Sequence, residues 1–441
     1  MTKQFSRGVR GARRSDHRIR PWSNMPLSTI VFVLAAFVAI SGCDKPPTFS
    51  ELINGKKKEE KQTAPPPVAK ASTAAAPRVE AHKAPEKPKR APQEVVSEFN
   101  TTPPERRNNQ QLIELAQSPE ATDQYTDDLY LATSGVNDAG MAVLPKFDKV
   151  QRLEIDGCGY TNNALINIAK MKSLVSLSMN GGSVADPTHN CDAGLAAIKE
   201  MHQLTSLSLE AANITPKGLA HIATMTWLES LNVARTRFND DSLEVLTPLV
   251  NLKELNISYT VVSDNGMRFL LPFTQLEILK IAHIPIRGDG LRDYAKAKAK
   301  TGLRHLTCFD HPGLEQTGYE GIFTFRKTLE YLDVSQAALT DDRFAKAVAP
   351  CTKLEALLVA ENPSFGDGGL SQIYKLKSLK RLYFYKNPGV TDQSIPQIAK
   401  LRKSLESVTF NATGVSEKGV QYLKKKLRPE CVVEYNYKKV E

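Results

Sequence analysis

Apolar and polar residues recur along the chain with a fixed period. Two clear copies are LESLNVARTRFNDDSLEVL, from Leu228, and LKELNISYTVVSDNGMRFL, from Leu252. They share L-x-x-L-x-L, a polar turn, a polar residue before Asp, and Gly or Ser before Leu. The opening apolar residue returns every 24 to 30 residues. It does so at Val150, Leu174, Leu204, Leu228, Leu252, Leu276, Leu303, Leu329, Leu354, Leu379 and Leu405. A period in this range is typical of a solenoid, in which each unit is stable only when stacked on its neighbours.

Each unit is expected to contain one strand and one helix. The L-x-L alternation predicts a short strand with one buried face, so that Leu231 and Val233 point inward while Asn232 points outward. Farther along, apolar residues lie four apart, as Phe344 and Val348 do, which predicts a helix with one buried face. A degenerate unit around Leu129 precedes the regular ones, giving about twelve units.

A Thr or Ser followed by Asp recurs where each helix is expected to begin. A hydroxyl there caps the helix by accepting from an amide of its first turn, and the aspartate lies where the helix dipole favours negative charge. Capping therefore explains why the aspartates are in register, without a ladder of calcium ions. The aspartates are Asp138, Asp192, Asp240, Asp264, Asp341, Asp367 and Asp392.

These units resemble leucine-rich repeats of the ribonuclease-inhibitor-like class, and especially the cysteine-containing subfamily, whose units read L-x-x-L-x-L-x-x-C-x-x-I-T-D-x-G-L. The position of that Cys is held here by Cys158, Thr236, Thr260, Asn362, Asn387 and Thr413. The resemblance covers Tyr125 to about Leu427. It implies an α/β fold: a curved right-handed solenoid of about twelve units, with a parallel sheet on the concave side and helices on the convex side. Such a fold offers a surface for binding rather than a deep catalytic cleft.

The front of the chain indicates export. Seven Lys and Arg residues and one acid in residues 1–25 precede the uncharged segment PLSTIVFVLAAFVAISG, and Cys43 follows at once. Ile40-Ser41-Gly42-Cys43 resembles the bacterial lipobox, which predicts that Cys43 is lipidated after residues before it are removed. The alternative is an uncleaved signal anchor. Both place the repeats in the cell envelope, anchored on the outer side of the cytoplasmic membrane.

Composition divides the rest of the chain into three parts. Residues 44–98 are rich in Pro, Ala, Lys and Glu, and we expect a disordered tether because they have too little apolar surface to offset ordering entropy. Residues 99–124 are expected to cap the open end of the solenoid, and residues 125–441 to form the repeats. The formal charge of +10 comes mainly from the front and the tether, so the repeat domain is nearly neutral and no nucleic-acid partner is expected.

Known catalytic and cofactor signatures are absent from the sequence. It contains no phosphate loop, no H-E-x-x-H and no C-x-x-C, so we expect no enzyme activity, cofactor, metal or small-molecule substrate. His305 and His311 with Asp310 form a weaker metal or acid–base candidate. Cys158 and Cys191 lie in successive units and are candidates for a disulfide.

The outward strand positions suggest where a partner binds. They are small and polar in the early units and become aromatic and basic later. We expect one patch formed by Phe309, Tyr331, Leu358, Arg381, Tyr383 and Tyr385. Tyr and Arg on an exposed sheet are typical of interface centres, so a protein or cell-envelope polymer is the expected partner. The alternatives are a regulator of an enzyme and a passive envelope spacer.

Overall fold

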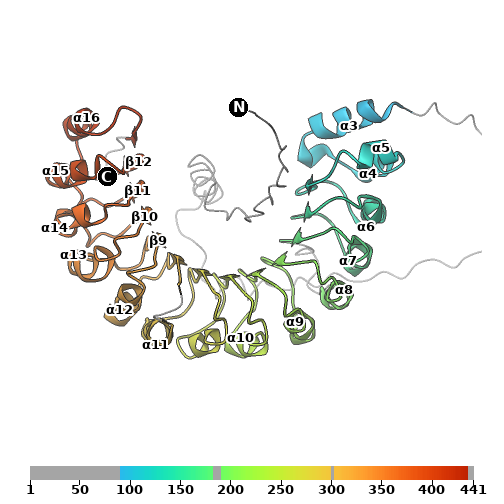
Figure 1. Ribbon diagram of the computed structural model, residues 1–441, viewed down its shortest axis with the longest axis horizontal. Coiled ribbons are helices and arrows are strands. Elements are labelled where there is room, and N and C mark those ends of the chain that lie inside the picture. Colours follow the sequence, from blue (N-terminus) through green and yellow to red (C-terminus); the bar gives the residue numbers. More distant parts are fainter. Residues whose placement is uncertain (1–89, 182–189, 299–301, 436–441) are drawn as a thin grey trace, which may run out of the picture. The chain divides into compact units, whose positions relative to one another are not determined.

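The computed structural model describes residues 90–181, 190–298 and 302–435, which lie in the compact unit Glu86–Glu441. Within them, thirteen strands form one parallel sheet in which each strand pairs with the next along the chain. Figure 1 shows the strands along the inner side of an arc and the helices along its outer side. The predicted α/β solenoid is therefore confirmed. The signal segment and most of the predicted tether lie outside the described residues.

The strands are short and regularly spaced. They are β1 (Asp128–Tyr130), β2 (Arg152–Glu154), β3 (Ser176–Ser178), β4 (Ser206–Ser208), β5 (Ser230–Asn232), β6 (Glu254–Asn256), β7 (Ile278–Lys280), β8 (His305–Thr307), β9 (Tyr331–Asp333), β10 (Ala356–Leu358), β11 (Arg381–Tyr385), β12 (Ser407–Asn411) and β13 (Val432–Glu434).

The helices alternate with these strands from β1 onward. The α-helices are α3 (Pro92–Thr101), α4 (Asn109–Leu115), α5 (Pro119–Thr122), α6 (Asp138–Met141), α7 (Asn162–Ile168), α8 (Asp192–Ile198), α9 (Pro216–Ala223), α10 (Asp240–Val245), α11 (Asp289–Ala297), α12 (Gln316–Thr324), α13 (Asp341–Arg343), α14 (Asp367–Leu370), α15 (Ile395–Ile398) and α16 (Glu417–Lys426). The tighter or wider turns are η2 (Pro104–Arg106), η3 (Leu144–Lys146), η4 (Gly266–Leu270), η5 (Phe344–Val348), η6 (Ile373–Lys375), η7 (Asp392–Ser394) and η8 (Ala399–Leu401).

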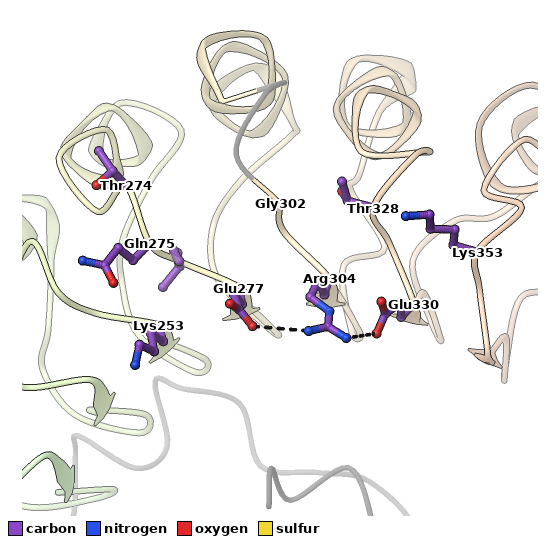
Figure 2. Close-up of a pocket in the computed structure, with 10 residues that line it drawn as sticks. Lys253, Thr274, Gln275, Glu277, Gly302, Arg304, Thr328, Glu330 and Lys353 are labelled. Atoms are coloured by element: carbon purple, nitrogen blue, oxygen red, sulfur yellow. Dashed lines mark hydrogen bonds and ion pairs between the residues drawn. The ribbon is translucent and has the colours of Figure 1, made fainter. Parts of the chain in front are cut away.

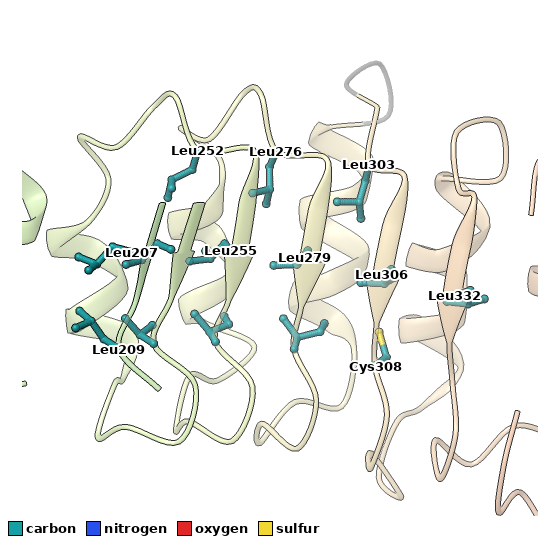
Figure 3. Close-up of a cluster of buried hydrophobic side chains, with 14 of the residues drawn as sticks. Leu207, Leu209, Leu252, Leu255, Leu276, Leu279, Leu303, Leu306, Cys308 and Leu332 are labelled. Atoms are coloured by element: carbon teal, nitrogen blue, oxygen red, sulfur yellow. The ribbon is translucent and has the colours of Figure 1, made fainter. Parts of the chain in front are cut away.

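The predicted strand register is confirmed. Leu231 and Val233 are fully buried, whereas Asn232 between them is partly exposed. Leu231 pairs with Leu207 of the preceding strand and Leu255 of the following one. Equivalent leucines thus stack in columns through the solenoid, as Figure 3 shows for several units. The core is continuous because each unit buries its apolar face against the next.

The aspartates at the helix starts join successive units. The Asp367 carboxylate accepts from the backbone N–H of Thr391 at 2.9 Å and from its hydroxyl. Asp392 does the same for Ser416, at 2.8 Å and 2.5 Å. The hydroxyls of Thr391 and Ser416 in turn cap their own helices. The predicted capping is therefore present, and each aspartate also binds the next unit.

The glycine of the repeat follows from this contact. A Cβ atom at Gly266 would stand 2.2 Å from Oδ1 of Asp240, and one at Gly419 would stand 2.1 Å from Oδ1 of Asp392. A side chain there would displace the carboxylate of the preceding unit from its hydrogen bonds. The Asp of one unit's Asp-x-Gly motif therefore contacts the Gly of the next unit's motif.

The Cys or Asn position of the repeat satisfies buried backbone groups. Asn362 is fully buried; its amide accepts from the N–H of Leu339 and donates to the carbonyl of Val334. The Cys158 thiol lies 3.0 Å from the carbonyl oxygen of Leu131. Different side chains therefore hold the same turn, which explains why this position tolerates Cys, Asn and Thr.

Both ends of the described chain differ from the sequence-based boundaries. Helix α3 begins at Pro92, so the predicted limit of the tether at residue 98 is wrong: Val95, Val96 and Phe99 supply one apolar helix face that packs on the core. Helices α3, α4 and α5 lie in or overlap the stretch 99–124 that was expected to cap the solenoid, and α3 begins before it. At the other end, β13 adds a thirteenth strand beyond the twelve expected.

Candidate binding surface

The concave face of the sheet consists of the outward side chains of successive strands. In the first half these residues bond to one another. Asp156 accepts from the Ser178 hydroxyl at 2.7 Å and from the Asn180 amide at 2.8 Å, and Asn180 accepts from the Ser208 hydroxyl at 2.6 Å. Because these polar groups are largely satisfied within the protein, this half offers few unpaired groups to a partner.

Five of the six predicted site residues come together on three adjacent strands. Tyr331 lies on β9, Leu358 on β10, and Arg381, Tyr383 and Tyr385 on β11. Leu358 is directly opposite Tyr383 in the sheet. All five side chains are half-buried, so each keeps part of its surface open to solvent. We refer to these five residues as the concave patch.

Burial governs the chemistry of the tyrosines in the patch. It raises the pKa of Tyr383 to about 12, and it raises the pKa of Tyr331 further. Both phenols are therefore neutral at physiological pH, and they act as apolar rings with one polar tip. This combination suits an interface in which one end of the ring is dry and the other is wet.

Phe309 does not join the concave patch, so that part of the prediction is wrong. Its ring packs edge-on against Tyr259, with 5.9 Å between the centroids. Phe309 comes after the last residue of β8, where the backbone leaves the strand before the positive φ of Asp310. The equivalent residue of the next unit is Ser335, so no aromatic side chain at this position joins Phe309 to the patch.

Beyond the strands, a row of side chains crosses five units. Arg235 lies 3.1 Å from Glu210 and covers the ring of Tyr259 at 4.1 Å; Tyr259 stacks on His283 at 5.1 Å, and His283 Nδ1 lies 2.7 Å from Asp310. We call Glu210, Arg235, Tyr259, His283 and Asp310 the edge ladder. The last four have φ between 49° and 61°, so the same left-handed turn recurs in each unit and aligns their side chains.

The structure does not bring together His305, His311 and Asp310, the weaker metal or acid–base candidate of the sequence. His311 is buried and donates from Nε2 to the carbonyl of Ile281, and burial lowers its pKa. His305 lies beside Tyr331, with 5.6 Å between the ring centroids. Asp310 pairs instead with His283, which sequence spacing did not bring to notice. The described residues include no group of three His, Cys, Asp or Glu placed to hold a metal ion.

Comparisons with known proteins address the fold. Residues 249–271 match the family model described as Leucine Rich repeat. The fold is a leucine-rich-repeat solenoid. An internalin (inlF) from Listeria monocytogenes is similar at 16% identity and a TM-score of 0.46, over 75% of this chain and 95% of that one. Internalin C2 from the same species is similar at 18% identity and a TM-score of 0.34, over 44% of this chain and 75% of the other. No curated protein matches.

The solenoid keeps its cysteines apart. Cys158 and Cys191 are both buried free thiols, so the predicted disulfide between them is not formed in the structure. The reason is orientation, since the Cys158 thiol points to Leu131 in the preceding unit, whereas Cys191 stands at the start of α8. Burial raises the pKa of Cys191 to about 11, so this thiol is protonated and unreactive at neutral pH. Cys43 lies outside the described residues.

A shallow hollow opens at the N-terminal ends of the strands, opposite the edge ladder (Figure 2). Three of its charged side chains pair with one another: Arg304 lies 3.7 Å from Glu277 and 2.7 Å from Glu330. Lys253 pairs with Glu229 outside the hollow, at 2.7 Å. This mutual neutralisation leaves little net charge to attract a ligand.

In the described residues no helix is both long and apolar enough to cross a membrane.

Proposed function

We propose that this protein is a non-enzymatic recognition module of the cell envelope that binds a protein through the concave patch. The observation that carries the proposal is the patch itself, in which three tyrosines, a leucine and an arginine gather on adjacent strands of a concave face whose first half is mainly polar. Aromatic residues and arginine dominate the centres of protein interfaces. A half-exposed cluster of this kind has a cost in solubility that a partner removes.

Membrane attachment belongs to the same proposal. The basic front, the uncharged segment and Ile40-Ser41-Gly42-Cys43 support lipidation at Cys43, and the Pro- and Ala-rich residues that follow support a spacer. The cysteine-containing subfamily of leucine-rich repeats is the relationship that we propose for the repeats. A lipid anchor with a long spacer would let the concave face reach partners at a distance from the membrane.

The binding proposal predicts that Tyr383→Ala reduces the free energy of partner binding by about 2 kcal/mol or more. This corresponds to a loss of roughly 30-fold in affinity. The reason is that Tyr383 stands on the middle strand position of β11, directly opposite Leu358. A fragment beginning at Glu86, which retains α3 and the whole described core, serves as bait against envelope extract. Affinities of the recovered protein are then measured by titration calorimetry.

Ser206→Ala is the matched control, because Ser206 faces the same side of the sheet on β4, far from the concave patch. Circular dichroism shows whether each variant is folded. A partner bound equally well by Tyr383→Ala and by the wild type would refute the patch as its binding surface.

The anchoring proposal predicts that metabolic labelling with a palmitate analogue depends on Cys43. Cys43→Ala should remove the label, because the thiol is the acceptor of the lipid. Membrane fractionation with Cys43→Ser provides the second measurement. Equal labelling of Cys43→Ala and wild type would replace the lipoprotein with the signal-anchor alternative.

A further inference from the structure

Asp333 is an acidic residue beside the concave patch that has no basic partner among the described residues. It ends β9, two residues after Tyr331 on the same face, and it is opposite Thr307 on β8 and Leu358 on β10. Oδ1 accepts from the backbone N–H of Ser335 at 3.0 Å. Within the described part of the chain, no Lys, Arg or His nitrogen lies within 4.0 Å of its carboxylate.

Other acids around Asp333 are paired. Glu330 lies 2.7 Å from Arg304, Glu355 lies 2.9 Å from Lys380, and Glu361 lies 3.6 Å from Lys386. These pairs join neighbouring units at the two ends of the strands. Asp333 lies between these two rows of ion pairs, on the concave face itself. Its neighbours there are aromatic, aliphatic or hydroxyl side chains.

This position is costly for a carboxylate. Burial raises the pKa of Asp333 to about 6, although hydrogen bonds from Ser335 partly oppose the shift. The group is thus mainly ionised at neutral pH but poorly solvated. A cation brought by a partner would offset the lost hydration, and the surrounding rings would contact the aliphatic stem that carries it.

We infer that the concave patch recognises a lysine or arginine side chain of a protein segment, whose cationic head pairs with Asp333 and whose stem packs on Tyr331 and Leu358. The inference rests on the proposed function and adds the chemistry of the partner. The unpaired negative charge disfavours an anionic envelope polymer at the same place. The tyrosine faces favour a cation, since their ring quadrupoles attract positive charge.

The test uses the full-length protein in detergent and a phage-displayed library of random twelve-residue peptides. Peptides that bind wild type and lose binding to Tyr383→Ala are expected to share a Lys or Arg. Asp333→Asn should then weaken the best peptide by about 30-fold, because it removes the charge while an amide oxygen still accepts from Ser335. Replacing the basic residue of the peptide by Gln should give a similar loss.

A double-mutant cycle shows whether the two groups touch. If they do, the Gln peptide should lose little further affinity on Asp333→Asn. Glu154→Gln is the matched control: Glu154 is also a half-buried acid on the concave face with a raised pKa, at about 7, but it lies on β2 beside Asp128 and Asp156. It should leave peptide affinity unchanged.

Several outcomes would overturn the inference. They are patch-dependent peptides without a basic residue, equal binding by Asp333→Asn, additive losses in the cycle, and no enrichment of basic peptides. Binding of polyphosphate, as a model polyanion, to the patch would also contradict it. These results leave the proposed function standing if the natural partner still depends on Tyr383, whereas a partner insensitive to Tyr383→Ala would remove both.

Discussion

Leu207→Ala is expected to destabilise the solenoid by about 2–5 kcal/mol, because it removes a large buried side chain and leaves a cavity that the neighbouring units fill only in part. Leu207 is 1% exposed and lies between Leu177 and Leu231 in the column of core leucines. Urea denaturation of the fragment beginning at Glu86, followed by circular dichroism, measures the loss.

The adjacent residue supplies the control. Ser206 is on the opposite face of the same strand, and Ser206→Ala should change the free energy of unfolding by no more than about 0.5 kcal/mol. Comparable losses for the two variants would mean that the two faces of β4 are assigned the wrong way round. Because neighbouring units support one another, the Leu207→Ala transition is also expected to broaden.

Gly288→Ala is expected to cost about 3–5 kcal/mol, since it combines backbone strain with a steric clash. Gly288 has φ of 119°, and a Cβ atom there would stand 2.3 Å from the backbone nitrogen of Gly318 in the next unit. Neither backbone can move without separating α11 from α12. The same urea titration measures the effect.

Two other glycines separate the two causes. Gly181 has φ of 63°, and a Cβ atom there would have no neighbour within 4 Å; the equivalent site in the next unit holds Ala211 at φ of 57°. Gly181→Ala should therefore cost only about 1 kcal/mol. Gly313 has neither strain nor neighbours, and Gly313→Ala should be nearly neutral. A loss at Gly288 no larger than that at Gly181 would exclude the clash as its main cause.

The strands were predictable because two constraints coincide in each unit. The L-x-L alternation assigns the buried face, and the repeat period then places Leu231 beside Leu207 and Leu255. The sequence did not reveal α3, because Val95, Val96 and Phe99 lie within a segment rich in Pro and Glu and outside the repeat. It also did not reveal β13, whose Val432 and Val433 follow α16 without another copy of the motif.

The structure places the outward residues within the strands on one face, as alternation predicted, whereas side chains beyond the strands make contacts that alternation did not predict. Tyr331, Tyr383 and Leu358 follow from alternation alone. Phe309 packs against Tyr259 instead of the patch. His283 pairs with Asp310 because both residues take the left-handed φ that recurs after the strand in successive units. The edge ladder could have been predicted from the sequence, because a polar or aromatic residue recurs at a fixed number of positions after the opening leucine of these units.

The aspartate contacts between units give the solenoid a direction. In each pair, the earlier unit provides the acceptor and the later unit provides the N–H groups at its helix start. Asn109 of α4 begins this series by accepting from the N–H of Asn137 at 2.9 Å and of Gly140 at 3.1 Å. Removing units from the front therefore takes the acceptor away from the N–H groups at the next helix start, whereas removing them from the back leaves a carboxylate without its donors. Each unit carries one acceptor for the unit after it and one set of donors for the unit before it, so a duplicated unit inherits both halves of the contact wherever it is inserted.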